Sequence, residues 1–123
     1  MDVLITYDIE NGRPDPHKPF LTAAEKEGLL FVWKGATHVN RLPNTTLWGV
    51  FDTTEAANEA FDRALKKTSQ SVGYALKLEK RITTAMRSTF VNSDVRKKPE
   101  PRWTGSTSFE TSRLHQVNDP FFR

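Results

Sequence analysis

The chain has 123 residues and no cysteine, and 37% of its residues are hydrophobic while 27% are charged. This is enough apolar material for one modest core and too much for a chain that is disordered throughout. Without cysteine, disulfides, thiol nucleophiles and cysteine-ligated metal sites are excluded. The net charge of +3 permits a nucleic-acid partner without requiring one. No run of about 18 apolar residues is present, so we expect a soluble, cytoplasmic protein with no membrane partner.

The first predicted element is a buried strand over residues 3–9, because β-branched and aromatic side chains dominate this run. Residues 10–17 contain prolines besides glycine, asparagine and aspartate, and this composition predicts a loop. A helix is expected next, with Pro19 in its first turn and Gly28 at its end.

The middle of the chain is predicted to form a hairpin of extended segments. Two such runs, at residues 29–33 and 37–39, precede a turn at Pro43-Asn44 and a buried strand at residues 46–51.

A second helix is predicted from the capping-box pattern Asp52-Thr53-Thr54-Glu55, with aspartate as a variant cap. Apolar residues then recur at three- and four-residue spacing at Ala57, Ala60, Phe61, Ala64 and Leu65. Apolar and polar residues alternate over residues 72–79, which predicts a half-exposed last strand.

This order of elements predicts an α+β domain of ferredoxin-like βαββαβ type over residues 1–87, in which two helices cover one face of an antiparallel sheet. The other face of the sheet would be bare and would bind something, most often a second copy of the chain.

Residues 88–123 are predicted to be a C-terminal extension. A short strand over residues 88–92 is expected, followed by a polar segment that is either flexible or docked. This segment contains aromatic residues spaced among polar ones, which are typical anchors for docking on a partner or on the same chain. The candidate anchors are Trp103, Phe109, Phe121 and Phe122.

The strongest candidate for chemistry is Asp8, a carboxylate at the end of the first strand. Such carboxylates commonly hold Mg²⁺, and Glu10, Asp15 and His17 follow closely enough to join a site. The alternative is that Asp8 only accepts hydrogen bonds from backbone N–H groups of the loop. Local sequence favours this alternative.

Several short pieces resemble one known group of proteins. The chain is similar to the SinR-like relatives of the Cas-two and VapD group in three places. These are Leu4-Ile5-Thr6-Tyr7-Asp8-Ile9, a helix that ends at Gly28, and Thr45-Thr46-Leu47-Trp48 before a strand. Members of this group are small ferredoxin-like proteins of CRISPR adaptation, toxin and defence systems.

The resemblance implies a homodimer that pairs its sheet faces. In the metal-dependent nucleases of the group, the acid after the first strand gathers a divalent ion between subunits, which here implies Asp8, with Tyr7 beside it, and Mg²⁺ or Mn²⁺. The basic residues expected to contact nucleic acid are Arg13, Lys18 and Arg41.

Two functions are therefore predicted. We favour a non-catalytic component that binds nucleic acid or protein, because one clear carboxylate per chain is little catalytic machinery. The alternative is a divalent-metal-dependent endonuclease with Asp8 at the dimer axis. A third option, a domain that senses a small ligand in a cleft of the sheet, has no residue that selects a ligand.

Overall fold

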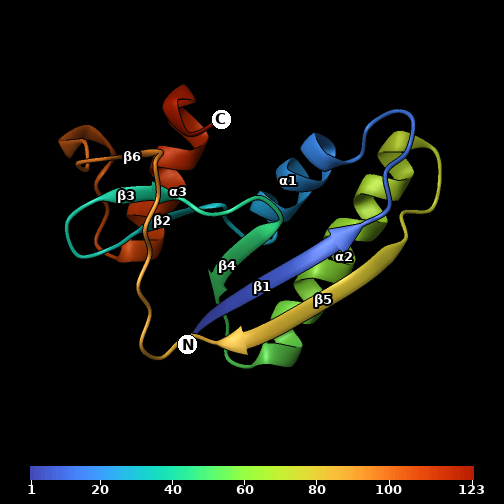
Figure 1. The fold of residues 1–123 in the computed structure, drawn as a ribbon, viewed down its shortest axis with the longest axis horizontal. Coiled ribbons are helices and arrows are strands. Elements are labelled where there is room, and N and C mark those ends of the chain that lie inside the picture. The colour runs from blue at the N-terminus through green and yellow to red at the C-terminus, as the bar shows by residue number, and fades with distance from the viewer.

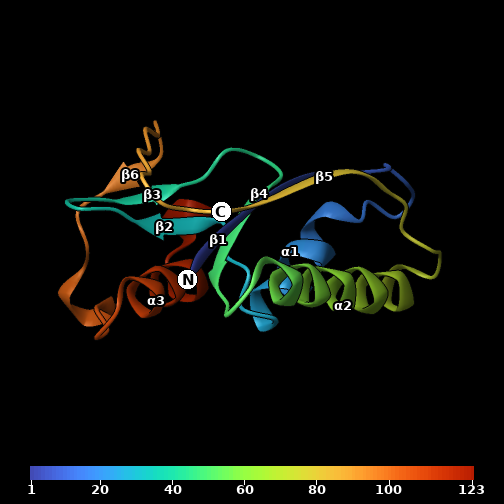
Figure 2. The same cartoon turned by 90° about the horizontal axis from the view of Figure 1, so that it is seen from below.

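A computed structural model describes residues 1–123 as a mixed α+β protein with three helices and six strands in two antiparallel sheets. The larger sheet has the strand order β4-β1-β5 and contains β1 (Asp2–Ile9), β4 (Thr46–Val50) and β5 (Leu78–Ala85). Two helices, α1 (His17–Lys26) and α2 (Thr54–Val72), pack together on one face of this sheet (Figures 1 and 2). The predicted α+β class is confirmed.

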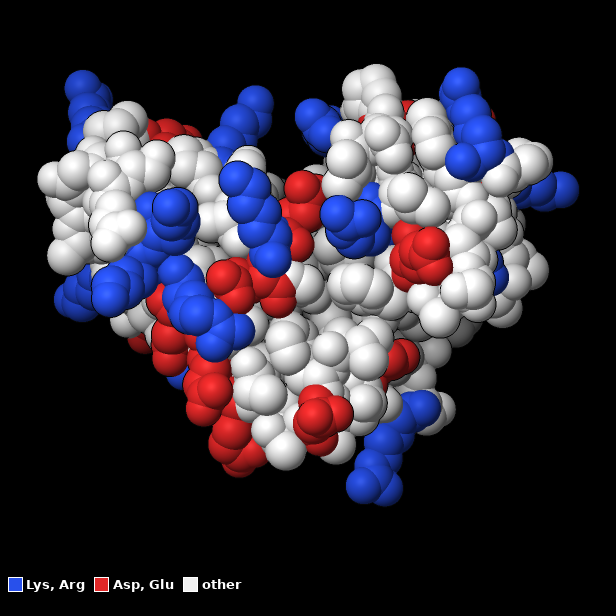
Figure 3. All heavy atoms as spheres, turned by 180° about the vertical axis from the view of Figure 1, so that it is seen from behind, with Lys and Arg blue, Asp and Glu red and all other residues white.

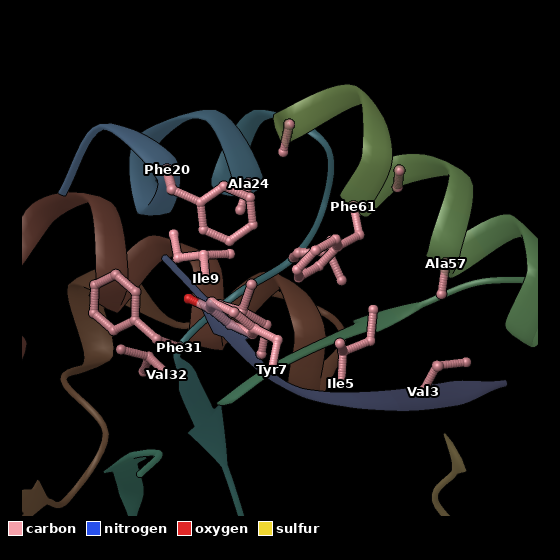
Figure 4. Close-up of a cluster of buried hydrophobic side chains, with 14 of the residues drawn as sticks. Val3, Ile5, Tyr7, Ile9, Phe20, Ala24, Phe31, Val32, Ala57 and Phe61 are labelled. Atoms are coloured by element: carbon pink, nitrogen blue, oxygen red, sulfur yellow. The ribbon is translucent and has the colours of Figure 1, made fainter. Parts of the chain in front are cut away.

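The core lies between this sheet and its two helices. Side chains of β1 alternate between buried and exposed, as a strand with one covered face requires. Tyr7 from β1, Phe20 from α1 and Phe61 from α2 form a mutual edge-to-face cluster, with ring centroids 5.0–5.2 Å apart (Figure 4). This geometry adds stability beyond the buried area alone.

Helix α1 ends where the sequence predicts. Gly28 has φ of +83°, a left-handed conformation that a residue with a side chain rarely adopts. Its carbonyl group also lies against Gly49 of β4, where a Cβ atom would collide with it. The end of α1 is therefore held close to the sheet.

Helix α2 corrects two details of the prediction. Its N-cap is Thr53 rather than Asp52, and the Thr53 side chain accepts a hydrogen bond from the Ala56 N–H at 3.0 Å. The helix continues to Val72, so the strand predicted over residues 72–79 is wrong, and β5 covers Leu78–Ala85 instead.

The alternation of apolar and polar residues that predicted a strand lies mostly in the loop between α2 and β5, and residues of this loop are held by hydrogen bonds. The Tyr74 hydroxyl donates to the Pro14 carbonyl at 2.7 Å, and the Leu76 N–H donates to the Ser69 hydroxyl at 2.9 Å. Such half-buried loop residues produce the same alternation as a half-exposed strand.

The smaller sheet contains β2 (Val32–Lys34), β3 (Val39–Arg41) and β6 (Arg96–Lys97), in that order. The segment predicted as a strand over residues 29–33 does not run along β4. Only Leu30 bridges Trp48, through backbone hydrogen bonds of 2.8 and 2.9 Å. The expected hairpin forms between β2 and β3, which pair antiparallel on either side of Gly35. The first of these segments meets β4 only at the Leu30–Trp48 bridge.

The C-terminal extension is folded. After β6 it forms a short 3-10 helix, then α3 (Ser108–Asn118), then a second 3-10 helix over Pro120–Phe122. The strand expected over residues 88–92 is absent. Figure 1 shows α3 beside β2 and β3, apart from α2. None of the three helices is long and apolar enough to span a membrane.

Helix α3 occupies the edge of β2 that no strand covers. The side-chain oxygen of Gln116 accepts hydrogen bonds from the Phe31 N–H at 2.7 Å and from the Val32 N–H at 3.2 Å. The Ser112 hydroxyl accepts from the Lys34 N–H at 2.8 Å. Side chains of α3 thus satisfy backbone groups that would otherwise need a neighbouring strand. This explains why β2 is stable without pairing with β4.

We predict that Gln116→Ala lowers the free energy of unfolding by about 2–5 kcal/mol, because two buried backbone N–H groups lose their acceptor. Val117→Ala is the matched control, since Val117 is the adjacent helical residue and is 37% exposed. Urea denaturation of both variants measures the difference. Equal stabilities would show that the Gln116 amide does not hold this edge.

Candidate functional site

A cleft lies between α1 and the segment that contains β3 and the loop before β4, and its far end is closed by residues of the C-terminal extension. It contains two adjoining pockets, of about 310 and 400 Å³, which share Leu21, Phe31 and Arg41 in their walls. Figure 3 shows a notch between two lobes of the molecule, with both basic and acidic side chains around it. The helix α1, the strand β3 and the end of the chain meet here.

Tyr7 forms part of the wall of the smaller pocket. Its ring is held in the core, and the residue is only 4% exposed. No hydrogen bond within the chain involves the Tyr7 hydroxyl group. Every fully buried side-chain polar atom of the chain has a hydrogen-bond partner, so this hydroxyl oxygen is not fully buried. The oxygen therefore reaches the pocket, and Figure 4 shows it pointing toward Phe31.

Arg41, at the end of β3, faces the same pocket and is half-buried. Its guanidinium lies over the ring of Phe31, 4.1 Å from the centroid, and its Nη1 donates to the Leu42 carbonyl at 3.0 Å. It forms no ion pair. Because a guanidinium has five N–H donors, most of them remain available to a ligand.

The two groups influence each other's titration. Burial raises the pKa of the Tyr7 phenol to about 12, and the nearby charge of Arg41 partly opposes this rise. Burial also lowers the pKa of the Arg41 guanidinium from its ordinary value, with an opposing contribution from Tyr7. At neutral pH the pocket therefore presents a neutral phenol donor beside a charged guanidinium.

The loop before β4 forms another wall, and its backbone is strained. Thr45 has φ of +57°, which is unfavourable for a β-branched residue. Its carbonyl accepts a hydrogen bond from the Tyr7 N–H at 3.0 Å. Strain of this kind concentrates at binding and catalytic sites.

The larger pocket adds two more basic residues, Lys18 of α1 and the terminal Arg123. Neither is in an ion pair, and the Arg123 side chain donates to the Val117 carbonyl at 2.7 Å. The one acidic residue of this pocket is Glu25, which accepts from the Gln116 amide at 2.9 Å. The whole cleft therefore has an excess of positive charge.

This arrangement can bind an anion that carries several hydrogen-bond acceptors. Guanidinium and phenol groups donate to such an anion, and charge-assisted hydrogen bonds are the stronger kind. The apolar walls of Leu21 and Phe31 limit the water that would compete for these donors. No group of three histidine, aspartate or glutamate side chains in the chain could hold a metal ion.

Asp8 lies on the opposite face of β1 from Tyr7, as strand alternation requires. Its partner in register is Lys80 of β5, and the two side chains form no ion pair. Asp8 belongs to no group of three potential metal ligands within the chain. The nuclease hypothesis, in which a divalent ion lies between two chains at Asp8, stays a prediction.

The basic residues predicted to contact nucleic acid separate into two places. Lys18 and Arg41 line the same pocket. Arg13 belongs to a different pocket, near Gly12 and Tyr74. The sequence also did not identify Phe31 and Arg123 as site residues, because no local signal connects positions so far apart in the chain.

The aromatic residues of the C-terminal extension pack on their own chain. Phe122 is buried in the main core, and Phe109 contacts Trp48 edge-to-face, with centroids 5.7 Å apart. Trp103 packs on His115 with centroids 5.5 Å apart. Phe121, 48% exposed, is the most accessible of the four predicted anchors. Three of them therefore stabilise this fold and offer little surface to a partner.

The sheet face expected to be bare is covered at one end. Leu4 and Trp48 pack there against Phe109 and neighbouring residues. At the other end Asp8 is exposed, and Ile82 is 66% exposed. A homodimer through this open part stays a prediction, which a sedimentation experiment showing only monomers would contradict.

Comparison with known protein families, with curated proteins and with solved structures finds no match to this chain. The resemblance to the SinR-like, Cas-two and VapD group therefore stays a prediction from short sequence pieces.

We predict that the Tyr7 phenol titrates near pH 12 in a Tyr74→Phe variant, in which Tyr7 is the single tyrosine. Ultraviolet absorbance of the phenolate measures this pKa. Adding Arg41→Gln should raise it further, because a nearby positive charge is lost. Since the folded pKa lies above the unfolded value of about 10, stability falls as pH rises from 10 to 12. Titration near pH 10 in the folded variant would contradict this burial.

Proposed function

We propose that this protein is a non-catalytic binding component that holds nucleic acid by its phosphates in the cleft around Arg41. The observation that supports this most is the half-buried Arg41 guanidinium, which has no ion-pair partner and lies beside the unpaired Tyr7 hydroxyl. A charged group in such a place is costly unless a counter-charge joins it. A phosphate supplies that counter-charge.

The distribution of charge favours a phosphate chain over a single small anion. Arg41, Lys18 and Arg123 lie along two adjoining pockets, so successive phosphates can meet successive cations. Contacts of this kind position a strand without reading its sequence. Apolar walls at Leu21 and Phe31 suit the bases or sugars of an unpaired strand.

Binding without catalysis is supported by the lining of the smaller pocket, which contains no carboxylate. Its one imidazole, that of His17, is hydrogen-bonded through Nε2 to the Asn11 side chain at 2.8 Å. A phosphate beside Arg41 would therefore meet no carboxylate in this pocket, and the one imidazole there already has a hydrogen-bond partner.

We also propose that residues 1–87 are a variant of the ferredoxin-like βαββαβ domain. The succession of β1, α1, β2, β3, β4, α2 and β5 supports this, with β3 as an extra strand and two helices on one face of the sheet. In this variant the second strand would have left the main sheet after the Leu30–Trp48 bridge. The role in a CRISPR-adaptation or toxin-type system is proposed only from the resemblance of the short sequence pieces named above.

We predict that Arg41→Gln weakens binding of a fluorescent single-stranded oligonucleotide about tenfold, or about 1.4 kcal/mol. Fluorescence anisotropy at low salt measures the affinity, because phosphate contacts weaken as salt rises. Lys98→Gln is the control, since it removes the same charge from an exposed residue outside the cleft.

Equal losses in the two variants would indicate diffuse attraction and contradict the assignment to the cleft. Absence of binding by the unaltered protein would overturn the proposed function. The oligonucleotide should also stay intact with Mg²⁺ or Mn²⁺ present. Cleavage that disappears in Asp8→Ala would instead support the endonuclease alternative.

A further inference from the structure

The hydroxyl of Tyr7 lies deep in the cleft. The residue is 4% exposed, so a ligand reaches its hydroxyl only through the pocket of about 310 Å³ that it lines. A phosphodiester within a strand has chain leaving it on two sides, so it needs more room beside this hydroxyl than a phosphate with chain on one side. A phosphate at the end of a strand therefore fits this pocket better.

Charge favours the same ligand. A phosphate monoester carries about −1.5 to −2 charges at pH 7, whereas a diester carries one. The difference matters most beside a half-buried cation, because the attraction between charges increases where water is excluded. Arg41 is such a cation, and its guanidinium is fixed over the Phe31 ring at 4.1 Å.

Hydrogen bonding points the same way. A monoester has three terminal oxygens that accept hydrogen bonds. The Tyr7 hydroxyl has no partner within the chain, and Arg41 uses one donor on the Leu42 carbonyl at 3.0 Å. These free donors come from two different strands, β1 and β3, which are held together by the fold.

From these observations we infer that the pocket between Tyr7 and Arg41 binds the terminal phosphate monoester of a nucleic-acid strand. This inference rests on the proposed function and makes it more specific. The adjoining pocket with Lys18 and Arg123 then receives the next phosphates of the same strand.

The test uses three oligonucleotides of one sequence with a dye on an internal base. One has a 5′-phosphate, one a 3′-phosphate, and one only hydroxyl ends. We expect one phosphorylated end to raise the affinity of the protein at least about tenfold over the hydroxyl-ended strand. The end that is preferred identifies which terminus enters the pocket.

Tyr7→Phe is the decisive variant, because it removes the hydroxyl and keeps the ring packed between Phe20 and Phe61. It should reduce the preference for the phosphorylated end severalfold, because the terminal phosphate loses one hydrogen-bond donor while the Arg41 charge remains. Tyr74→Phe, which removes the other phenol of the chain, should keep the preference.

Equal affinity for all three oligonucleotides would overturn this inference and leave the proposed function standing. A preference that Tyr7→Phe leaves undiminished, or that Tyr74→Phe reduces equally, would overturn the assignment to this pocket. Failure to bind any of the three would overturn the proposed function as well.

Discussion

The side-chain amide of Gln116 connects the parts of this protein that form the cleft. Its oxygen accepts from the N–H groups of Phe31 and Val32, and its nitrogen donates to Glu25 of α1. One buried group thus links α3, the start of β2 and the first helix. Each backbone N–H left without an acceptor would cost about 1–3 kcal/mol, so alternative positions of α3 are strongly disfavoured.

The position of Arg41 follows from that constraint. With the Phe31 backbone fixed by α3, the Phe31 ring forms a platform for the Arg41 guanidinium. Arg41 in turn stands beside the Tyr7 hydroxyl, which the aromatic core holds from the other side. The proposed phosphate site is therefore supported by rigid elements on each side, and little ordering is needed when a ligand binds.

The success of sequence-based prediction depended on how each element is stabilised. The strand β1 and helices α1 and α2 bury apolar side chains with a clear period, and these were located from the sequence. Helix α3 could not be found this way, because its buried residues are polar: Thr111, Ser112, His115 and Gln116. The sequence also indicated Tyr7, Lys18 and Arg41 as candidate site residues. It could not show that they line one cleft with Phe31 and Arg123, because that arrangement depends on the packing of α3.

Hydrogen exchange of individual backbone amides tests most directly whether α3 holds the edge of β2. The N–H groups of Phe31, Val32 and Lys34 donate to side chains of α3 and should exchange as slowly as the core amides of β1. If these three amides instead exchange as fast as those of the loop at residues 88–92, then α3 does not cover this edge, and the cleft does not have the shape described above.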